Sequence, residues 1–278
     1  MLAQSAPATA RRLKALIDPI HVVAYFADEP DRELRALGLR NSWDAYFAGR
    51  AAPLGRTPAE VVHAAFYNFA DGEVARHVPR VWDLTTPAAA LAARQRGCVA
   101  ALRRILGRLA DSPAVARAAD LAVRAGLSGP PEGRILYAAL RALPVPDEPV
   151  ARLWHGATLL REFRGDGHIT ALVAAGISGT ESHVLQALWE GTPAERFGRV
   201  QHLPADRLAA VIAGLRDRGL IGADGWLTAA GRETRERIEA MTDRLDAPAY
   251  RCLTPAELHR LITDLEPIAG RLDAAGSR

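Results

Sequence analysis

Apolar residues recur at the three- and four-residue spacing of an amphipathic α-helix along most of this 278-residue chain. Between residues 9 and 26, this spacing gathers aliphatic side chains on one side of a predicted helix, and the set is Leu13, Leu16, Ile17, Ile20, Val23 and Ala24. Before residue 219, we find no stretch of convincing length with the two-residue period of a β-strand. The spacing therefore predicts that the first part of the chain is all-α.

Helix starts are marked by Ser or Thr followed by Pro, a pair that suits the N-cap and the first helical position. Such pairs open predicted helices at Thr57, Thr86, Ser112 and Thr192. The proline-containing segment 144–147 divides the chain into two predicted domains, residues 1–146 and 147–278. The second domain should begin with a long helix from residue 148 to about 163, interrupted at residues 164–167 and resumed to residue 175.

The composition is that of a globular protein, with 49% hydrophobic and 24% charged residues. No apolar run is long enough to span a bilayer, and residues 1–10 lack the basic-then-apolar order of a secretory signal. Cys98 and Cys252 do not have the spacing of a metal site. We therefore expect a cytoplasmic protein that holds no metal and no cofactor. The net charge of +3 comes from arginine, so DNA binding has to be argued from local clusters.

Residues 178–239 follow a different order of elements. A helix over residues 178–189 precedes a short helix opened by Thr192, and a third helix is predicted over residues 206–218. A tight turn at residues 223–225 then joins two short apolar segments, and a final helix begins at Ala229. Two short helices, a turn, a third helix and a hairpin describe a winged helix-turn-helix. The predicted fold class is therefore all-α with one small β-hairpin, the wing, near Leu220–Thr228.

The segments LRDRGLI (215–221) and GWLTAAGRETRERIE (225–239) resemble MarR-type winged helix-turn-helix regulators, and the resemblance covers about residues 178–245. More loosely, FYNF (66–69) and REFRGDGH (161–168) resemble segments of an actinobacterial helix-turn-helix group of unsettled function. The resemblance implies a homodimer that binds DNA through the third helix. The arginines outside the apolar stripe of that helix are Arg207, Arg216 and Arg218.

One departure from the MarR pattern counts against DNA binding. The wing of MarR-type regulators is long and basic at its tip, whereas the turn here is Ala223-Asp224-Gly225. The predicted third helix also carries Asp206 and Asp217 beside its arginines. Because phosphate contacts dominate affinity for DNA, a weakly charged head should bind weakly. An ordinary solvated helix face is the alternative interpretation.

Two polar segments in the helical part predict a pocket for a small anionic molecule. His and Tyr four residues apart, and polar residues three or four apart on the long helix, would project from common faces. Arginines with His and Tyr suit a carboxylate or sulfate. The candidate ligand-binding residues are His63, Tyr67, Asn68, His155, Thr158, Arg161, Glu162, Arg164 and His168. A hydrogen-bonded core histidine and a structural ion-pair network are the alternatives.

These observations leave two main hypotheses for function. The first is a ligand-responsive, MarR-like transcriptional regulator. The second is a small-molecule-binding protein or enzyme of specialised metabolism on a winged-helix scaffold that does not bind DNA. In the second, an acid or base would come from Asp83, Tyr67, His155, Glu162 or His168, while Arg161 and Arg164 hold an anion. A protein-interaction module is a third possibility.

Overall fold

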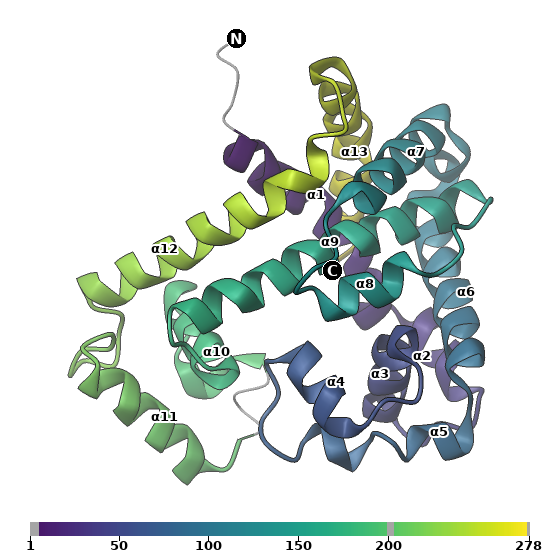
Figure 1. Ribbon diagram of the computed structural model, residues 1–278. Coiled ribbons are helices and arrows are strands. Elements are labelled where there is room, and N and C mark those ends of the chain that lie inside the picture. The colour runs from purple at the N-terminus through teal and green to yellow at the C-terminus, as the bar shows by residue number, and fades with distance from the viewer. Residues whose placement is uncertain (1–5, 199–202, 277–278) are drawn as a thin grey trace.

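A computed structural model describes residues 6–198 and 203–276, and Figure 1 shows them as an assembly of helices. The thirteen α-helices of this part are α1 (Ala6–Phe26), α2 (Asp28–Arg35), α3 (Ser42–Ala51), α4 (Ala59–Phe66), α5 (Val81–Leu84), α6 (Pro87–Leu106), α7 (Pro113–Ser128), α8 (Ile135–Arg141), α9 (Pro149–Ala174), α10 (Gly179–Trp189), α11 (Ala205–Asp217), α12 (Ala229–Asp246) and α13 (Pro255–Gly276). Short 3-10 turns connect several of them, among them Ala194–Arg196.

The larger of two hydrophobic cores joins the N-terminal helices to the C-terminal one. It contains buried side chains from α1, α6, α7, α8, the first half of α9, and α13. Helix α9 crosses the middle of the molecule (Figure 1), and most of its residues from Val150 to Phe163 are buried. A helix buried on nearly all sides has to be apolar all round, and the polar residues that α9 does bury need partners. Those residues form the candidate site.

The smaller core begins where the larger one ends. It contains Ala171 and Leu172 from the end of α9, together with side chains of α10, α11, α12 and the Ala194–Arg196 turn. We refer to residues 178–246, where the sequence predicts a helix-turn-helix, as the helix-turn-helix unit. Both cores thus include part of α9, and the division of the chain into domains at residue 147 stays a prediction.

The predicted interruption of the long helix at residues 164–167 is wrong, because α9 continues unbroken from Pro149 to Ala174. Glycine lowers helix propensity, but neighbouring side chains leave little room for a Cβ at Gly167, and at Gly165 the ends of flexible side chains would have to move. A Cβ on Gly167 would lie 2.8 Å from the Arg134 guanidinium, and one on Gly165 would lie 3.1 Å from that of Arg161. Asp166 accepts a hydrogen bond from the Tyr137 backbone N–H at 3.0 Å instead of capping a new helix.

The predicted β-hairpin wing is also wrong, since the described residues contain no strand. Only one bridge joins Ile221 and Leu227, around a hydrogen bond of 2.8 Å from Gly222 N–H to the Trp226 carbonyl. A second hydrogen bond, 3.1 Å from the Thr228 N–H to the Leu220 carbonyl, flanks this bridge, and the pairing ends there because helices begin and end at these two residues. Leu220 N–H bonds the Leu215 carbonyl at the end of α11, and the Thr228 hydroxyl caps α12. The fold class is therefore all-helical, with a tight turn in place of the wing.

Several helix starts follow the sequence pattern. The hydroxyls of Thr86 and Ser112 cap α6 and α7, and Ser178 with Glu181 forms a capping box at α10. Thr57 does not cap α4, where Pro58 occupies that position without a side-chain bond. None of the described helices is long and apolar enough to cross a membrane.

Candidate functional site

A cavity of about 540 Å³ lies between the helical part and the helix-turn-helix unit. Its walls come from α1, α3, the end of α4 and α9 on one side, and from α10 and α12 on the other. This volume is in the usual range for small organic ligands. The side chains that line the cavity include Tyr25, Trp43, Tyr46, Arg50, Phe66, Tyr67, Asn68, Arg161, Glu162, His168, Gln186 and Arg235.

Two arginines and one glutamate form the charged part of the cavity wall. Glu162 is 3% exposed, and its Oε2 lies 3.8 Å from both Arg50 Nη2 and Arg161 Nη1. These separations are too long for hydrogen bonds, so Glu162 leaves the facing N–H groups of both guanidinium groups able to bond another acceptor. Arg50 donates to the Tyr46 hydroxyl at 2.8 Å and lies 4.1 Å from the centre of the Phe66 ring, while its Nε is buried without a partner. The side chains that line this part of the cavity therefore carry more positive than negative charge, and Asp18, outside the lining, lies 3.9 Å from Arg161 Nε.

A buried hydrogen-bonded chain supports this wall from behind. His21 contacts the Thr158 hydroxyl at 3.2 Å and the Tyr25 hydroxyl at 3.1 Å, and its Nε2 lies 3.6 Å from Glu162. Burial, reinforced by Arg161, holds the pKa of His21 well below its ordinary value, so the imidazole is neutral. Thr158 thus contacts the cavity residue Tyr25 only through His21, and it does not itself line the cavity.

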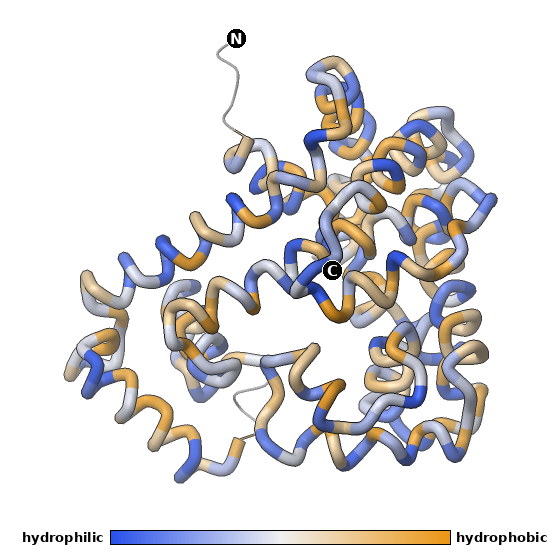
Figure 2. The backbone as a smooth tube through the Cα atoms, viewed as in Figure 1, coloured by the Kyte–Doolittle hydropathy of each residue, from blue (hydrophilic) through white to orange (hydrophobic). Residues whose placement is uncertain are grey.

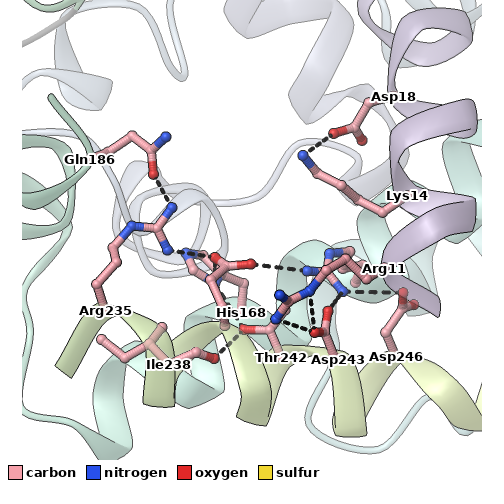
Figure 3. Close-up of polar contacts among 12 residues, drawn as sticks. Arg11, Lys14, Asp18, His168, Gln186, Arg235, Ile238, Thr242, Asp243 and Asp246 are labelled. Carbon is pink, nitrogen blue, oxygen red and sulfur yellow. Dashed lines mark hydrogen bonds and ion pairs between the residues drawn. The ribbon is translucent and has the colours of Figure 1, made fainter. Parts of the chain in front are cut away.

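On the opposite side, α12 is joined to α9 and α1 by a charged network, shown in Figure 3. Arg164 of α9 lies 2.8 Å from Asp243, 3.2 Å from Glu239 and 3.4 Å from Asp246 of α12. Arg11 of α1 reaches Asp243 at 2.5 Å. We call these five residues the α9–α12 network.

Two cavity residues extend the α9–α12 network into the cavity. Arg235 bonds Glu239 at 2.8 Å and Gln186 of α10, and His168 contacts the Thr242 hydroxyl at 3.0 Å (Figure 3). Burial lowers the pKa of His168 to about 4, so this imidazole is neutral near pH 7. A molecule in the cavity would therefore contact side chains that hold α10, α12 and α9 together.

Five of the nine predicted ligand-binding residues line the cavity: Tyr67, Asn68, Arg161, Glu162 and His168. The other four lie elsewhere. His63 is 3.6 Å from Asp71, Thr158 lies behind His21, and Arg164 belongs to the α9–α12 network. His155 is a core histidine, 6% exposed, and burial lowers its pKa to about 4. Asp83 is exposed on α5 and lies outside the cavity.

Sequence reasoning missed most of the aromatic wall and two of the cavity arginines. Tyr25, Trp43, Tyr46 and Arg50 come from α1 and α3, and Arg235 comes from α12. A weak signal existed, because His21 and Tyr25 are four residues apart, as are Tyr46 and Arg50. That spacing shows that each pair shares a helix face, but it does not show that the two faces meet at one cavity.

The surface of the helix-turn-helix unit carries little positive charge. Arg207, Arg216 and Arg218 are all exposed on or beside α11, as required for contact with DNA. Arg218, however, is paired with Glu181 at 3.0 Å, and residues 178–228 contain five arginines against six carboxylates. Figure 2 shows that the middle of α11 is apolar and its ends are hydrophilic, and exposed alanines account for part of the middle.

Among the described residues, no group of three or more His, Cys, Asp or Glu side chains is placed to hold a metal ion. Comparison with curated proteins and with solved structures gives no match. The sequence pattern of a helix-turn-helix family, in contrast, matches residues 10–277. Because this match spans both cores and the cavity between them, the chain as a whole belongs to that helix-turn-helix family.

Proposed function

We propose that the protein is a ligand-responsive, MarR-like transcriptional regulator, cytoplasmic and homodimeric, whose ligand binds in the cavity described above. Membership of a helix-turn-helix family suggests a DNA-binding regulator in general. The observation that carries the ligand-responsive part is the composition of the cavity wall. Side chains of α10 and α12, the helices on either side of α11, face side chains of the helical part across one space.

The ligand that suits this wall is a small anion with a flat apolar body. Arg50 and Arg161 present guanidinium donors that Glu162 does not bond, so an acidic group can accept from both. Trp43, Tyr46 and Phe66 offer aromatic faces beside them, and offset or edge-on packing of a ring against such faces is favourable. The nearest carboxylates, Glu162 at 3.8 Å from both arginines and Asp18 at 3.9 Å from Arg161, are too far to accept hydrogen bonds, so an anion would supply the acceptors.

Such a ligand would act on DNA binding through helix positions. A ligand shifts a conformational equilibrium only if it binds one state better than the other. The cavity supplies that difference, because its volume and its polar contacts depend on where α10 and α12 sit relative to α9. A ligand that fits the observed arrangement holds the helix-turn-helix unit in one orientation.

The proposal is tested by titrating the full chain with 3-anilinobenzoate, an acid with two aromatic rings, in an isothermal calorimeter. We expect Arg161→Ala to weaken binding at least tenfold, because the charge opposite the acid is removed. Arg152→Ala is the matched control, since both side chains are on α9 and 34% exposed, and Arg152 lies outside the cavity. Equal affinity in the two variants, or no binding by the natural chain, would contradict a cavity ligand of this class.

A second candidate function is favoured by one specific observation, the excess of carboxylates over arginines in residues 178–228. In this alternative the same cavity serves a small-molecule-binding protein or enzyme that does not bind DNA. Glu162 or His168 would then move a proton while Arg161 holds the anion. One measurement distinguishes the two candidates. The fluorescence anisotropy of a labelled mixed-sequence duplex, titrated with the protein at low salt, should rise for a regulator and stay constant for a protein that does not bind DNA.

A further inference from the structure

A strained turn lies between the cavity and the helix-turn-helix unit. Tyr67 has φ 59° and ψ −47°, and in the described part of the chain it is the one non-glycine residue with positive φ. The Asn68 N–H bonds the Phe66 carbonyl at 2.6 Å, which makes Tyr67 the central residue of a γ-turn with positive φ. Turns of this kind are rare and strained, and they persist only where surrounding contacts hold them.

The contacts that hold the turn come from the start of α10. The Tyr67 hydroxyl donates to the Ile177 carbonyl at 2.5 Å, two residues before the helix begins. Gly179, the first residue of α10, packs so closely that an added Cβ would overlap the Tyr67 carbonyl oxygen and crowd the Asn68 Cα. Because the backbone of the turn touches the backbone of α10, the turn cannot relax unless the start of α10 moves.

The other side of the turn faces the cavity and carries an unsatisfied acceptor. Tyr67 and Asn68 both line the cavity, and Asn68 Oδ1 is buried without a hydrogen-bond partner. Arg50 Nε is a buried donor without a partner, and its guanidinium lies over the Phe66 ring, next to the turn. Two residues that line one cavity thus carry an unmatched donor and an unmatched acceptor, both on atoms covered by their neighbours. Buried polar atoms of this kind are expected to find partners.

We propose that the ligand carries a hydrogen-bond donor in addition to its acidic group, and that this donor bonds Asn68. The bond changes the geometry of the γ-turn, and the start of α10 shifts as a result. The inference rests on the proposed function, in which the acid binds Arg50 and Arg161. The added donor satisfies Asn68 Oδ1, and Asn68 supplies the N–H that closes the γ-turn. Binding at Asn68 therefore acts on the turn geometry, whereas binding at the arginines alone does not.

Two acids that differ in one group test the donor. In 3-anilinobenzoate an N–H stands meta to the carboxylate, where it cannot bond the carboxylate internally, and in 3-phenoxybenzoate an ether oxygen takes its place. Calorimetry on the full chain should show at least tenfold tighter binding of 3-anilinobenzoate than of 3-phenoxybenzoate, and Asn68→Leu should reduce this ratio to near one. Circular dichroism checks that the Asn68 variants are folded. Asn68→Ser keeps a polar side chain that is too short to reach the same position, so it should lower the affinity ratio as Asn68→Leu does.

Hydrogen exchange tests whether the change at the γ-turn reaches α10. With 3-anilinobenzoate bound, amide exchange over residues 177–189 should change at least threefold, while 3-phenoxybenzoate leaves it unaltered. Tyr67→Phe, which removes the bond to Ile177, should keep the affinity ratio but abolish the exchange effect. Equal affinities for the two acids, or a ratio unaffected by Asn68→Leu, overturns the inference and leaves the proposed function standing if binding still requires Arg161. If neither acid binds, both fall.

Discussion

Asp246 shows how a single buried carboxyl can make stability depend on pH. It is 1% exposed, its Oδ1 lacks a partner, and burial raises its pKa from 3.8 to about 7 even though Arg164 opposes the shift. Between pH 4 and 7 the folded chain therefore keeps a proton that the unfolded chain releases. Asp166 behaves alike, with a pKa raised to about 7 mainly by burial.

The sign of the effect follows from linkage. Because the folded state binds more protons in this window, the free energy of unfolding falls as pH rises from about 4 to about 7, by on the order of 1 kcal/mol per pH unit for each such group. Asp246→Asn should flatten this dependence, since Arg164 keeps Asp243 and Glu239 as partners. Urea titrations at pH 4.5, 6 and 7.5 measure it. Asp217→Asn, on exposed surface, is the control, and an equal slope in both variants would refute the assignment.

For single residues, the sequence predicts which types of side chain a site contains better than it predicts which side chains contact each other. The stripe of polar groups on the long helix predicts one surface, yet Arg161 lines the cavity and Arg164 lies in the α9–α12 network. The two are three residues apart, and different helices pack against the two positions. Arg50 could not be assigned at all, because its partner Glu162 is more than a hundred residues away in the chain.

At the scale of elements, close contact between α7 and α9 depends on glycine. A Cβ on Gly156 would lie 2.8 Å from Val123 N and 3.0 Å from the Ala122 carbonyl carbon, both backbone atoms of α7. Gly126 of α7 makes the reciprocal approach to Leu159. Backbone cannot move aside as a flexible side chain can, so small residues set the distance between these helices.

Gly156→Ala should therefore destabilise the fold by about 1–3 kcal/mol, as overpacking of a tight core does. Gly270→Ala is the matched control within α13, where an added Cβ meets nothing within 4 Å. It should be neutral or more stable by up to about 1 kcal/mol, because alanine favours helix. Urea denaturation of both variants decides the matter. A Gly156 variant as stable as the control would contradict the packing argument.

The existence and order of the elements were predictable, whereas interruptions were not. Helical spacing and Thr-Pro or Ser-Pro pairs located most helices, because those signals are local. The glycines at 165 and 167 predicted a break, but tertiary packing overrode their low propensity. The apolar segments around residues 220 and 227 predicted a hairpin, but the helices on either side left room for one bridge.

For the whole molecule, the decisive quantity is the charge that the helix-turn-helix unit presents to DNA. If the proposed function holds, replacing Arg207, Arg216 and Arg218 together by Ala should weaken binding to all duplex sequences. The slope of log K against log salt should flatten by roughly 0.9 for each DNA phosphate that the variant no longer neutralises. Anisotropy titrations from low to moderate salt measure this.

Arg96→Ala with Arg108→Ala, two exposed arginines outside the helix-turn-helix unit, is the control and should leave the salt slope unchanged. A natural chain that fails to bind duplex DNA even at low salt would instead favour the second candidate function. An equal decrease of affinity in the control would show that binding follows net charge and not α11.

Helix α9 contributes to both hydrophobic cores without a linker between them. Many regulators can exchange recognition and sensor modules by recombination at a flexible joint. Here the crossover point would fall inside a buried helix whose side chains are matched to neighbours on both sides. If the proposed function holds, specificity for DNA and for ligand should therefore have diversified by point substitutions under mutual constraint. Chimaeras of two relatives joined within α9 should fold only when both parents share the same α9 contacts.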